Sequence, residues 1–179
     1  MMKKALKIVG GVIGVVFVVF LVTSAFLPKA AHVERSTVIN GPREQVFAYA
    51  LDLDNFKRWD PGLKADPATQ IQVRGSGVGA EYEWRSQKNG HGMVTITSVE
   101  PPGPIRGRLE FFEPFSDVAG VGWNFETEGA GTKVTCTFDQ EYPYLLRFLA
   151  LCMDPILGPQ YEQSLASLKS DLEALPPAQ

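Results

Sequence analysis

The sequence predicts an α+β fold in which a curved antiparallel sheet of six to seven strands surrounds a long C-terminal helix, with one transmembrane helix at the N-terminus. Three observations support this prediction. Residues 8–27 form an uncharged apolar run. Residues 70–138 alternate apolar and polar side chains in short segments between turn residues, which is typical of consecutive antiparallel strands. Residues 158–175 place apolar side chains on one stripe of a helix, and such a stripe needs an apolar surface to lie on.

The N-terminal run is long enough to cross a membrane, since about 20 residues of helix cover the roughly 30 Å of a bilayer core. Lys3, Lys4 and Lys7 precede the run, which favours a cytoplasmic N-terminus and an extracytoplasmic domain. A cleaved signal peptide is the alternative, although its apolar core usually spans only about 7–15 residues. We therefore expect residues 1–31 to form an anchor with a short linker, and residues 32–179 to form one domain.

The domain is expected to open with a strand and two short helices. Residues 33–39 are rich in β-branched side chains and predict the first strand. Asn40 is a candidate N-cap for the helix that follows, with Pro42 in its first turn. Residues 54–61 predict a second short helix, and residues 61–69 predict an irregular segment.

Six further strands are expected, joined by short turns. The glycine-rich segment 75–79 has a GxGxG spacing, but period-two alternation follows it instead of a helix, so it predicts a turn and not a phosphate-binding loop. Asn89 and Gly90 form a strong tight-turn signal. The predicted strands span residues 70–74, 80–85, 91–99, 105–111, 118–127 and 133–138.

The C-terminal segment from residue 142 onward has helical periodicity. Pro155 and Pro159 interrupt it, so the sequence predicts either two helices or one kinked helix, with Pro159 in a first helical turn. Pro176 and Pro177 are expected to stop the helix. The apolar stripe consists of Tyr161, Leu165, Leu168, Leu172 and Leu175.

Charge and cysteine content exclude several classes of function. Residues 8–179 carry 14 basic and 20 acidic side chains, a net charge of −6, which argues against nucleic acid or an anionic lipid surface as the domain's own partner. Cys136 and Cys152 allow a disulfide in an exported domain, but two buried free thiols are the favoured interpretation. Together with His32 and His91 they show no metal-ligand spacing, so we expect no metal and no cofactor.

Five local patterns occur in an order that resembles the START-like, helix-grip superfamily. The order is closest to its polyketide cyclase/dehydrase and lipid-transport branch, the SRPBCC group. The resemblance covers residues 33–175 and implies a deep apolar cavity between sheet and helix that holds hydrophobic molecules. It implies no single reaction, because members include carriers, sensors, cyclases and hydrolases. The matching segments are residues 34–47, 53–61, 75–84, 131–135 and 165–172.

Aromatic side chains on the expected inner face are the best candidates for a binding site, since ligand cavities are mostly apolar. Plain core packing is the alternative for each ring. His91 is more typical of an exposed hairpin position than of a general base, and Asp60 of a helix terminus. No catalytic residue is assigned, because the sequence lacks a nucleophile elbow and an HExxH motif. The candidate lining residues are Trp59, Tyr82, Trp84, Phe111, Trp123, Phe125, Phe138 and Tyr161.

These observations predict a membrane-anchored domain that binds a hydrophobic small molecule or lipid. The first alternative is an enzyme that cyclises or dehydrates a polyketide-like substrate in the same cavity, and the second is an interaction module with a filled core. Buried ionisable groups facing the cavity would favour the enzyme, whereas a dry apolar cavity favours a carrier. A fully packed interior would leave only the interaction module.

Overall fold

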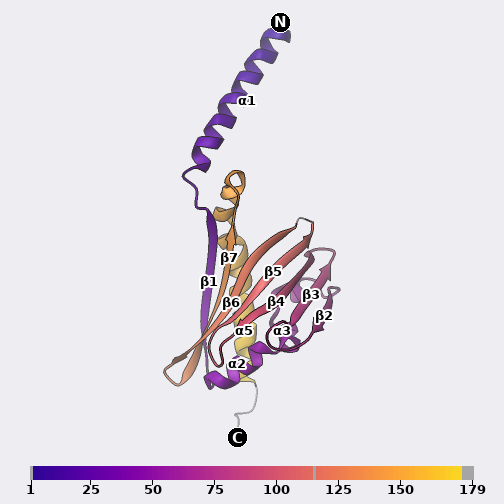
Figure 1. Cartoon of the computed structure of the whole chain (residues 1–179), viewed down its shortest axis with the longest axis vertical. Coiled ribbons are helices and arrows are strands. Elements are labelled where there is room, and N and C mark those ends of the chain that lie inside the picture. Colours follow the sequence, from indigo (N-terminus) through magenta and orange to yellow (C-terminus); the bar gives the residue numbers. More distant parts are fainter. Residues whose placement is uncertain (1, 115, 175–179) are drawn as a thin grey trace.

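The computed structural model describes residues 2–114 and 116–174, and the description of side chains begins at Gly10. An N-terminal helix, α1 (Met2–Ser24), extends away from a domain in which one sheet curves around one long helix (Figure 1). The predicted stop at residues 176–177 and the last stripe residue, Leu175, lie outside the described residues, as do the side chains of residues 3–7.

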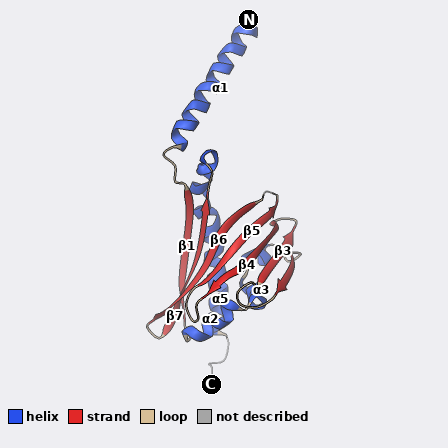
Figure 2. Ribbon diagram, viewed as in Figure 1, coloured by secondary structure: helices blue, strands red, loops and turns tan. Residues whose placement is uncertain are grey.

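The described residues form one seven-stranded antiparallel sheet, so the predicted α+β class and sheet are confirmed (Figure 2). The strand order is β1-β7-β6-β5-β4-β3-β2, in which the first strand pairs with the last and the other strands follow as a meander. Most strands extend beyond their predicted ends because pairing with a neighbour continues into the turns. The strands are β1 (Ala30–Ile39), β2 (Gln70–Arg74), β3 (Glu81–Ser86), β4 (Gly90–Val99), β5 (Ile105–Glu113), β6 (Asp117–Glu128) and β7 (Gly131–Glu141).

Three short helices, α2 (Arg43–Leu51), α3 (Leu53–Trp59) and α4 (Pro61–Ala65), lie between β1 and β2. The prediction of an irregular segment over residues 61–69 is therefore wrong in its first part. The Asp60 side chain accepts a hydrogen bond from the Gly62 N–H at 2.8 Å and caps α4.

The predicted N-cap of α2 is also corrected. Pro42 occupies the N-cap position, and it makes no side-chain cap hydrogen bond. Asn40 instead donates its backbone N–H to Glu173 Oε1 at 3.1 Å, which ties the turn after β1 to the far end of the terminal helix. A tertiary contact has replaced the local cap.

The C-terminal segment is one long helix, α5 (Ala150–Glu173), preceded by a 3₁₀ turn, η1 (Tyr144–Leu149). Pro159 lies inside α5, so its predicted place in a first helical turn is wrong. Pro155 and Pro159 are both exposed, so the carbonyl groups that lose a helical partner lie near water. The stripe residues Leu165, Leu168 and Leu172 are buried in the main core, as predicted.

The two cysteines are both free, but their environments differ. Cys136 is buried on β7, as expected. Cys152 is exposed on the first turn of α5, so the expectation of two buried thiols is wrong for this residue.

Among the residues whose side chains the structure describes, which in α1 begin at Gly10, no helix has the combined length and hydropathy required to cross a membrane.

Candidate ligand-binding cavity

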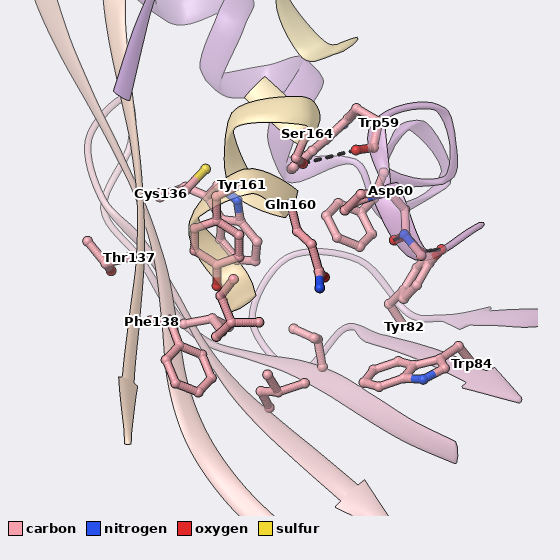
Figure 3. Close-up of a pocket in the computed structure, with 18 of the residues that line it drawn as sticks. Trp59, Asp60, Tyr82, Trp84, Cys136, Thr137, Phe138, Gln160, Tyr161 and Ser164 are labelled. Atoms are coloured by element: carbon pink, nitrogen blue, oxygen red, sulfur yellow. Dashed lines mark hydrogen bonds between the residues drawn. The ribbon is translucent and has the colours of Figure 1, made fainter. Parts of the chain in front are cut away.

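A cavity of about 390 Å³ lies between the inner face of the sheet and α5, with α3 along one side. Its position follows from alternation: every second side chain of β3 to β7 points toward α5, and the apolar stripe of α5 faces them. Figure 3 shows side chains from the sheet, from α5 and from the segment around Trp59 converging on this space. The apolar wall includes Val94, Leu109, Val121, Met153 and Leu157.

Seven of the eight predicted site residues line this cavity. Phe125 does not, and this prediction is corrected. Its side chain is 2% exposed and packs edge-on against Phe47 with ring centroids 5.6 Å apart, where α2 covers the sheet. The seven lining residues are Trp59, Tyr82, Trp84, Phe111, Trp123, Phe138 and Tyr161.

Sequence reasoning missed Phe56, which sits at the centre of the aromatic cluster. Its ring meets Trp59 at 4.4 Å, Tyr82 at 4.7 Å and Trp123 at 6.2 Å between centroids, each in an edge-to-face arrangement. The signal was present, because Phe56 and Trp59 are three residues apart and share one face of a short helix. Phe56 fixes the orientation of rings from α3, β3 and β6.

A glycine makes room for one wall of the cavity. A Cβ atom added to Gly92 on β4 would lie 2.3 Å from Cζ2 of Trp84 and 2.7 Å from the Glu110 carbonyl oxygen. Only a residue without a side chain lets the Trp84 indole lie across the neighbouring strand. A glycine inside a β-branched strand was the available signal for this close approach.

The outer face of β3 and β4 is polar, as the alternation predicted. Arg74 pairs with Glu81 at 2.7 Å and with Glu83 at 2.9 Å. His91 Nε2 lies 2.9 Å from Glu83 Oε1, and its side chain is only 16% exposed. His91 is therefore a member of an ion-pair network on the outer face; it is less exposed than expected and does not reach the cavity.

Tyr82 and Asp60 form the most chemically suggestive pair on the cavity wall. The Tyr82 hydroxyl donates a hydrogen bond to Asp60 Oδ2 at 2.8 Å, while Asp60 Oδ1 holds the Gly62 N–H (Figure 3). Burial, reinforced by the Asp60 carboxylate, raises the pKa of Tyr82 above its usual value. The phenol is therefore a neutral donor at physiological pH, and Asp60 is both a helix cap and a cavity residue.

The side of the cavity that α5 forms carries polar groups, and some of them lack a hydrogen-bond partner among the described residues. Ser164 donates to the Trp59 carbonyl oxygen at 2.9 Å and links α5 to α3 (Figure 3). In contrast, no hydrogen bond is assigned to the Tyr161 hydroxyl or the Gln160 amide among the described residues, and Gln160 extends into the cavity. Burial raises the pKa of Tyr161 above its usual value, so its hydroxyl is also neutral.

Trp59 supplies a third unused polar group. Its side chain is fully buried, and its Nε1 is one of two buried side-chain atoms that lack a hydrogen-bond partner in the described part of the chain. An unpaired buried N–H costs free energy, and this Nε1 is enclosed by protein, so Trp59 borders the cavity through the rest of its indole ring. The described residues contain no group of three His, Cys, Asp or Glu side chains placed to hold a metal ion.

The family model for polyketide cyclase / dehydrase and lipid transport matches residues 30–173. The chain belongs to this family. The match covers the whole sheet and α5 and leaves α1 outside. No curated protein matches the chain.

Solved structures share the fold at low sequence identity. The Aha1 dimer from Colwellia psychrerythraea matches with a TM-score of 0.57 and 19% identity, over 80% of this chain and 97% of that one. TTHA0849 from Thermus thermophilus matches with a TM-score of 0.55 and 22% identity, over 80% and 97%. The di-domain ARO/CYC StfQ from the steffimycin biosynthetic pathway matches with a TM-score of 0.61 and 12% identity, over 80% of this chain and 51% of that one.

Proposed function

We propose that this protein binds one hydrophobic small molecule or lipid in the cavity between the sheet and α5. The observation that supports this most directly is the volume of about 390 Å³ left open behind an aromatic wall. Ligand pockets typically enclose about 300–1,000 Å³ and are mostly apolar with a few polar groups. A filled interior, as an interaction module would have, leaves no such space.

The unused polar groups favour a ligand that carries a hydrogen-bond acceptor on an apolar body. The neutral Tyr161 hydroxyl and the Gln160 amide can both donate a hydrogen bond. A ketone, ester or carboxyl oxygen would satisfy one or more of these groups. The rest of the ligand would gain roughly 25 cal/mol for each Å² of apolar surface removed from water.

Ligand capture can be tested on the full chain purified from its host in mild detergent. Native mass spectrometry should detect a co-purifying apolar compound of defined mass. All three tryptophans of the chain line the cavity, so their fluorescence should respond to the extracted compound or to an added aromatic ketone in a saturable manner. No bound compound, together with no fluorescence response to fatty acids, isoprenoids or aromatic ketones, would refute the proposal.

A cyclase or dehydratase activity is the second candidate, and the Tyr82–Asp60 pair supports it. A phenol bonded to a carboxylate can pass a proton between Asp60 and a bound carbonyl compound, as cyclisation or dehydration requires. Similarity in fold to an ARO/CYC protein is consistent with this chemistry but shows the fold alone. If turnover exists, Tyr82→Phe should abolish it and keep ligand binding; equal turnover by the variant would remove this candidate.

We also propose that α1 anchors the domain to a membrane with the N-terminus in the cytoplasm and the domain outside it. The support is the apolar run 8–27 and the lysines ahead of it. Alkaline carbonate extraction should leave the full chain in the membrane pellet, and protease added outside spheroplasts should digest the domain. Release by carbonate would refute the anchor, and loss of the N-terminal mass would indicate a cleaved signal peptide.

A further inference from the structure

A second surface, distinct from the cavity, gathers exposed apolar side chains on η1 and the first turns of α5. We call it the η1 patch. Its members are 40–58% exposed, which is unusual for large apolar side chains that lie close together. The η1 patch consists of Tyr144, Leu145, Leu146, Phe148, Leu151 and Ile156.

The η1 patch lies beside the end of α1. The Phe148 ring meets Phe20 edge-on with centroids 6.3 Å apart, and the Tyr144 hydroxyl donates to the Leu21 carbonyl oxygen. Figure 1 shows η1 and the start of α5 at the same end of the domain as α1. The patch is therefore continuous with the surface of α1.

From Gly10 to Val22, the neighbouring surface of α1 is apolar on every side of the helix. Residues 12–22 of α1 include eight large apolar side chains that are 55–65% exposed, and their consecutive positions point in every direction around the axis. A helix that is apolar on all sides belongs in a protein core or in lipid. Among the side chains of α1 described from Gly10 onward, the domain covers those of the last turns, through Phe20 and Leu21.

The composition of the η1 patch fits the boundary between lipid headgroups and acyl chains. The Arg147 guanidinium lies 5.0 Å from the centre of the Tyr144 ring, so Tyr144 in the patch and Arg147 beside it both have apolar bodies and polar ends. The nearest carboxylate on α5, Asp154, is already paired with Arg35 at 2.8 Å. No unpaired acidic group of α5 or η1 among the described residues opposes the approach of a lipid surface at the patch.

We propose that the η1 patch rests in the surface of a lipid bilayer, partly immersed beside the point where α1 enters. Two residues of the same α5 turns, Met153 and Leu157, line the cavity. The patch thereby places one wall of the cavity against the membrane, so that an apolar ligand passes between bilayer and cavity around the start of α5. This inference rests on the proposed anchor for its geometry and on the proposed cavity for its purpose.

The test uses the exposed thiol of Cys152, which lies between Leu151 and Met153. The full chain, labelled there with a polarity-sensitive fluorophore, is reconstituted in vesicles of phosphatidylcholine. A lipid-borne quencher should reduce the emission strongly. Iodide in the water phase should quench this label several-fold less than it quenches the same fluorophore on a short water-soluble peptide. The Cys152→Ser chain gives the background from the buried Cys136.

The control label sits on the same helix at Ser170→Cys in the Cys152→Ser chain, about 27 Å away along α5 at 1.5 Å per residue. It should respond to iodide and not to the lipid-borne quencher. A double variant, Leu145→Asp with Leu146→Asp, should make the Cys152 label accessible to iodide, whereas Val78→Asp, at an exposed apolar residue outside the patch, should not.

Equal iodide quenching of the two labels in vesicles would overturn the proposal, even if carbonate extraction shows that α1 is inserted. Protection of Cys152 from both quenchers would also overturn it, because a protein surface such as a second copy of the chain would then cover the patch. Cavity binding is measured separately by tryptophan fluorescence on the same preparations, so its failure is distinguishable from failure of the membrane contact.

Discussion

Tyr161 separates packing from binding at the scale of one side chain. Its ring packs against the core, while its hydroxyl opens on the cavity without a hydrogen-bond partner among the described residues. Tyr161→Phe removes only the hydroxyl, so we expect the free energy of unfolding to change by less than about 0.5 kcal/mol. Affinity for an acceptor-bearing ligand should fall about fivefold, since one hydrogen bond contributes about 1 kcal/mol. Urea unfolding and fluorescence titration measure the two quantities.

The matched control for this substitution is Tyr49→Phe. The Tyr49 hydroxyl donates to Asp171 at 3.3 Å outside the cavity, so its removal should leave ligand affinity unchanged. A loss of affinity in both variants would mean that the effect is not local to the cavity, and unchanged affinity in Tyr161→Phe would remove the hydroxyl from the binding site.

Glu83 is the centre of the charge network on the outer face. Its side chain is 15% exposed, and hydrogen bonds from His91, then from Arg74 and Arg85, lower its pKa from 4.5 to about 2. Because the folded-state pKa is depressed, the unfolded chain binds more protons between these two values. The stabilisation is present above about pH 4.5 and is lost as the pH falls toward 2.

Glu83→Gln tests this assignment by removing the titrating group. We expect a loss of about 1 kcal/mol at pH 7, at the upper end for partly exposed ion pairs. Between pH 4.5 and 2 the variant should lose less stability than the parent chain, because one of its acid-sensitive groups is absent. Urea unfolding across that range measures the slopes, and parallel slopes would contradict the network.

At the scale of one element, the position of the terminal helix depends on contacts with a β1 side chain that its own sequence pattern does not show. Arg35 on β1 bonds Asp154 at 2.8 Å and Glu162 at 2.9 Å, which lie two turns apart on α5. Its guanidinium passes over Gly158, where an added Cβ would lie 2.2 Å from Arg35 Nη2. The glycine therefore lets a strand side chain clamp the helix.

A double-mutant cycle isolates this clamp. Gly158→Ala changes helix propensity and crowds Pro159 in any background, and these terms cancel when it is compared between the parent chain and Arg35→Ala. The remaining difference should be about 0.5–1 kcal/mol, with Gly158→Ala more costly when Arg35 is present. Urea unfolding of the four chains gives the coupling, and a coupling near zero would show that the guanidinium moves aside freely.

Elements with a strong local pattern were predictable from sequence, and those set by tertiary contact were not. The alternation of β3 identified Tyr82 and Trp84 as inward residues. Pro159 misled the prediction of the helix start, because packing of α5 along the sheet carries the helix through a residue that weakens it locally. The cap at Asn40 failed for the same reason, since its backbone is held by a distant glutamate.

At the scale of the whole molecule, most aromatic residues of the site were predictable from the sequence, but the size and position of the cavity that they line were not. Period-two and helical patterns state which side chains face inward, but not how far the sheet stands from the helix. Phe125 faces inward and is packed by α2, whereas Phe138 faces inward and borders the cavity. The difference depends on where α2 ends over the sheet, which no pattern in the strands records.

An open cavity also sets a trade between stability and function for the whole domain. Leu109 lines the cavity and is half-buried although it faces inward, so a larger ring there has space to fill. Leu109→Trp should raise the free energy of unfolding by about 0.5–2 kcal/mol, as cavity filling commonly does, and should abolish ligand binding. Overpacking would instead lower stability by about 1–3 kcal/mol. Circular dichroism melting measures the change in stability, and native mass spectrometry measures ligand binding.

The control is Val118→Trp, at an exposed residue of β6, which should leave binding intact. Full ligand binding by Leu109→Trp would show that the ligand lies elsewhere, because one cavity of this volume cannot hold both the ring and a guest of similar size.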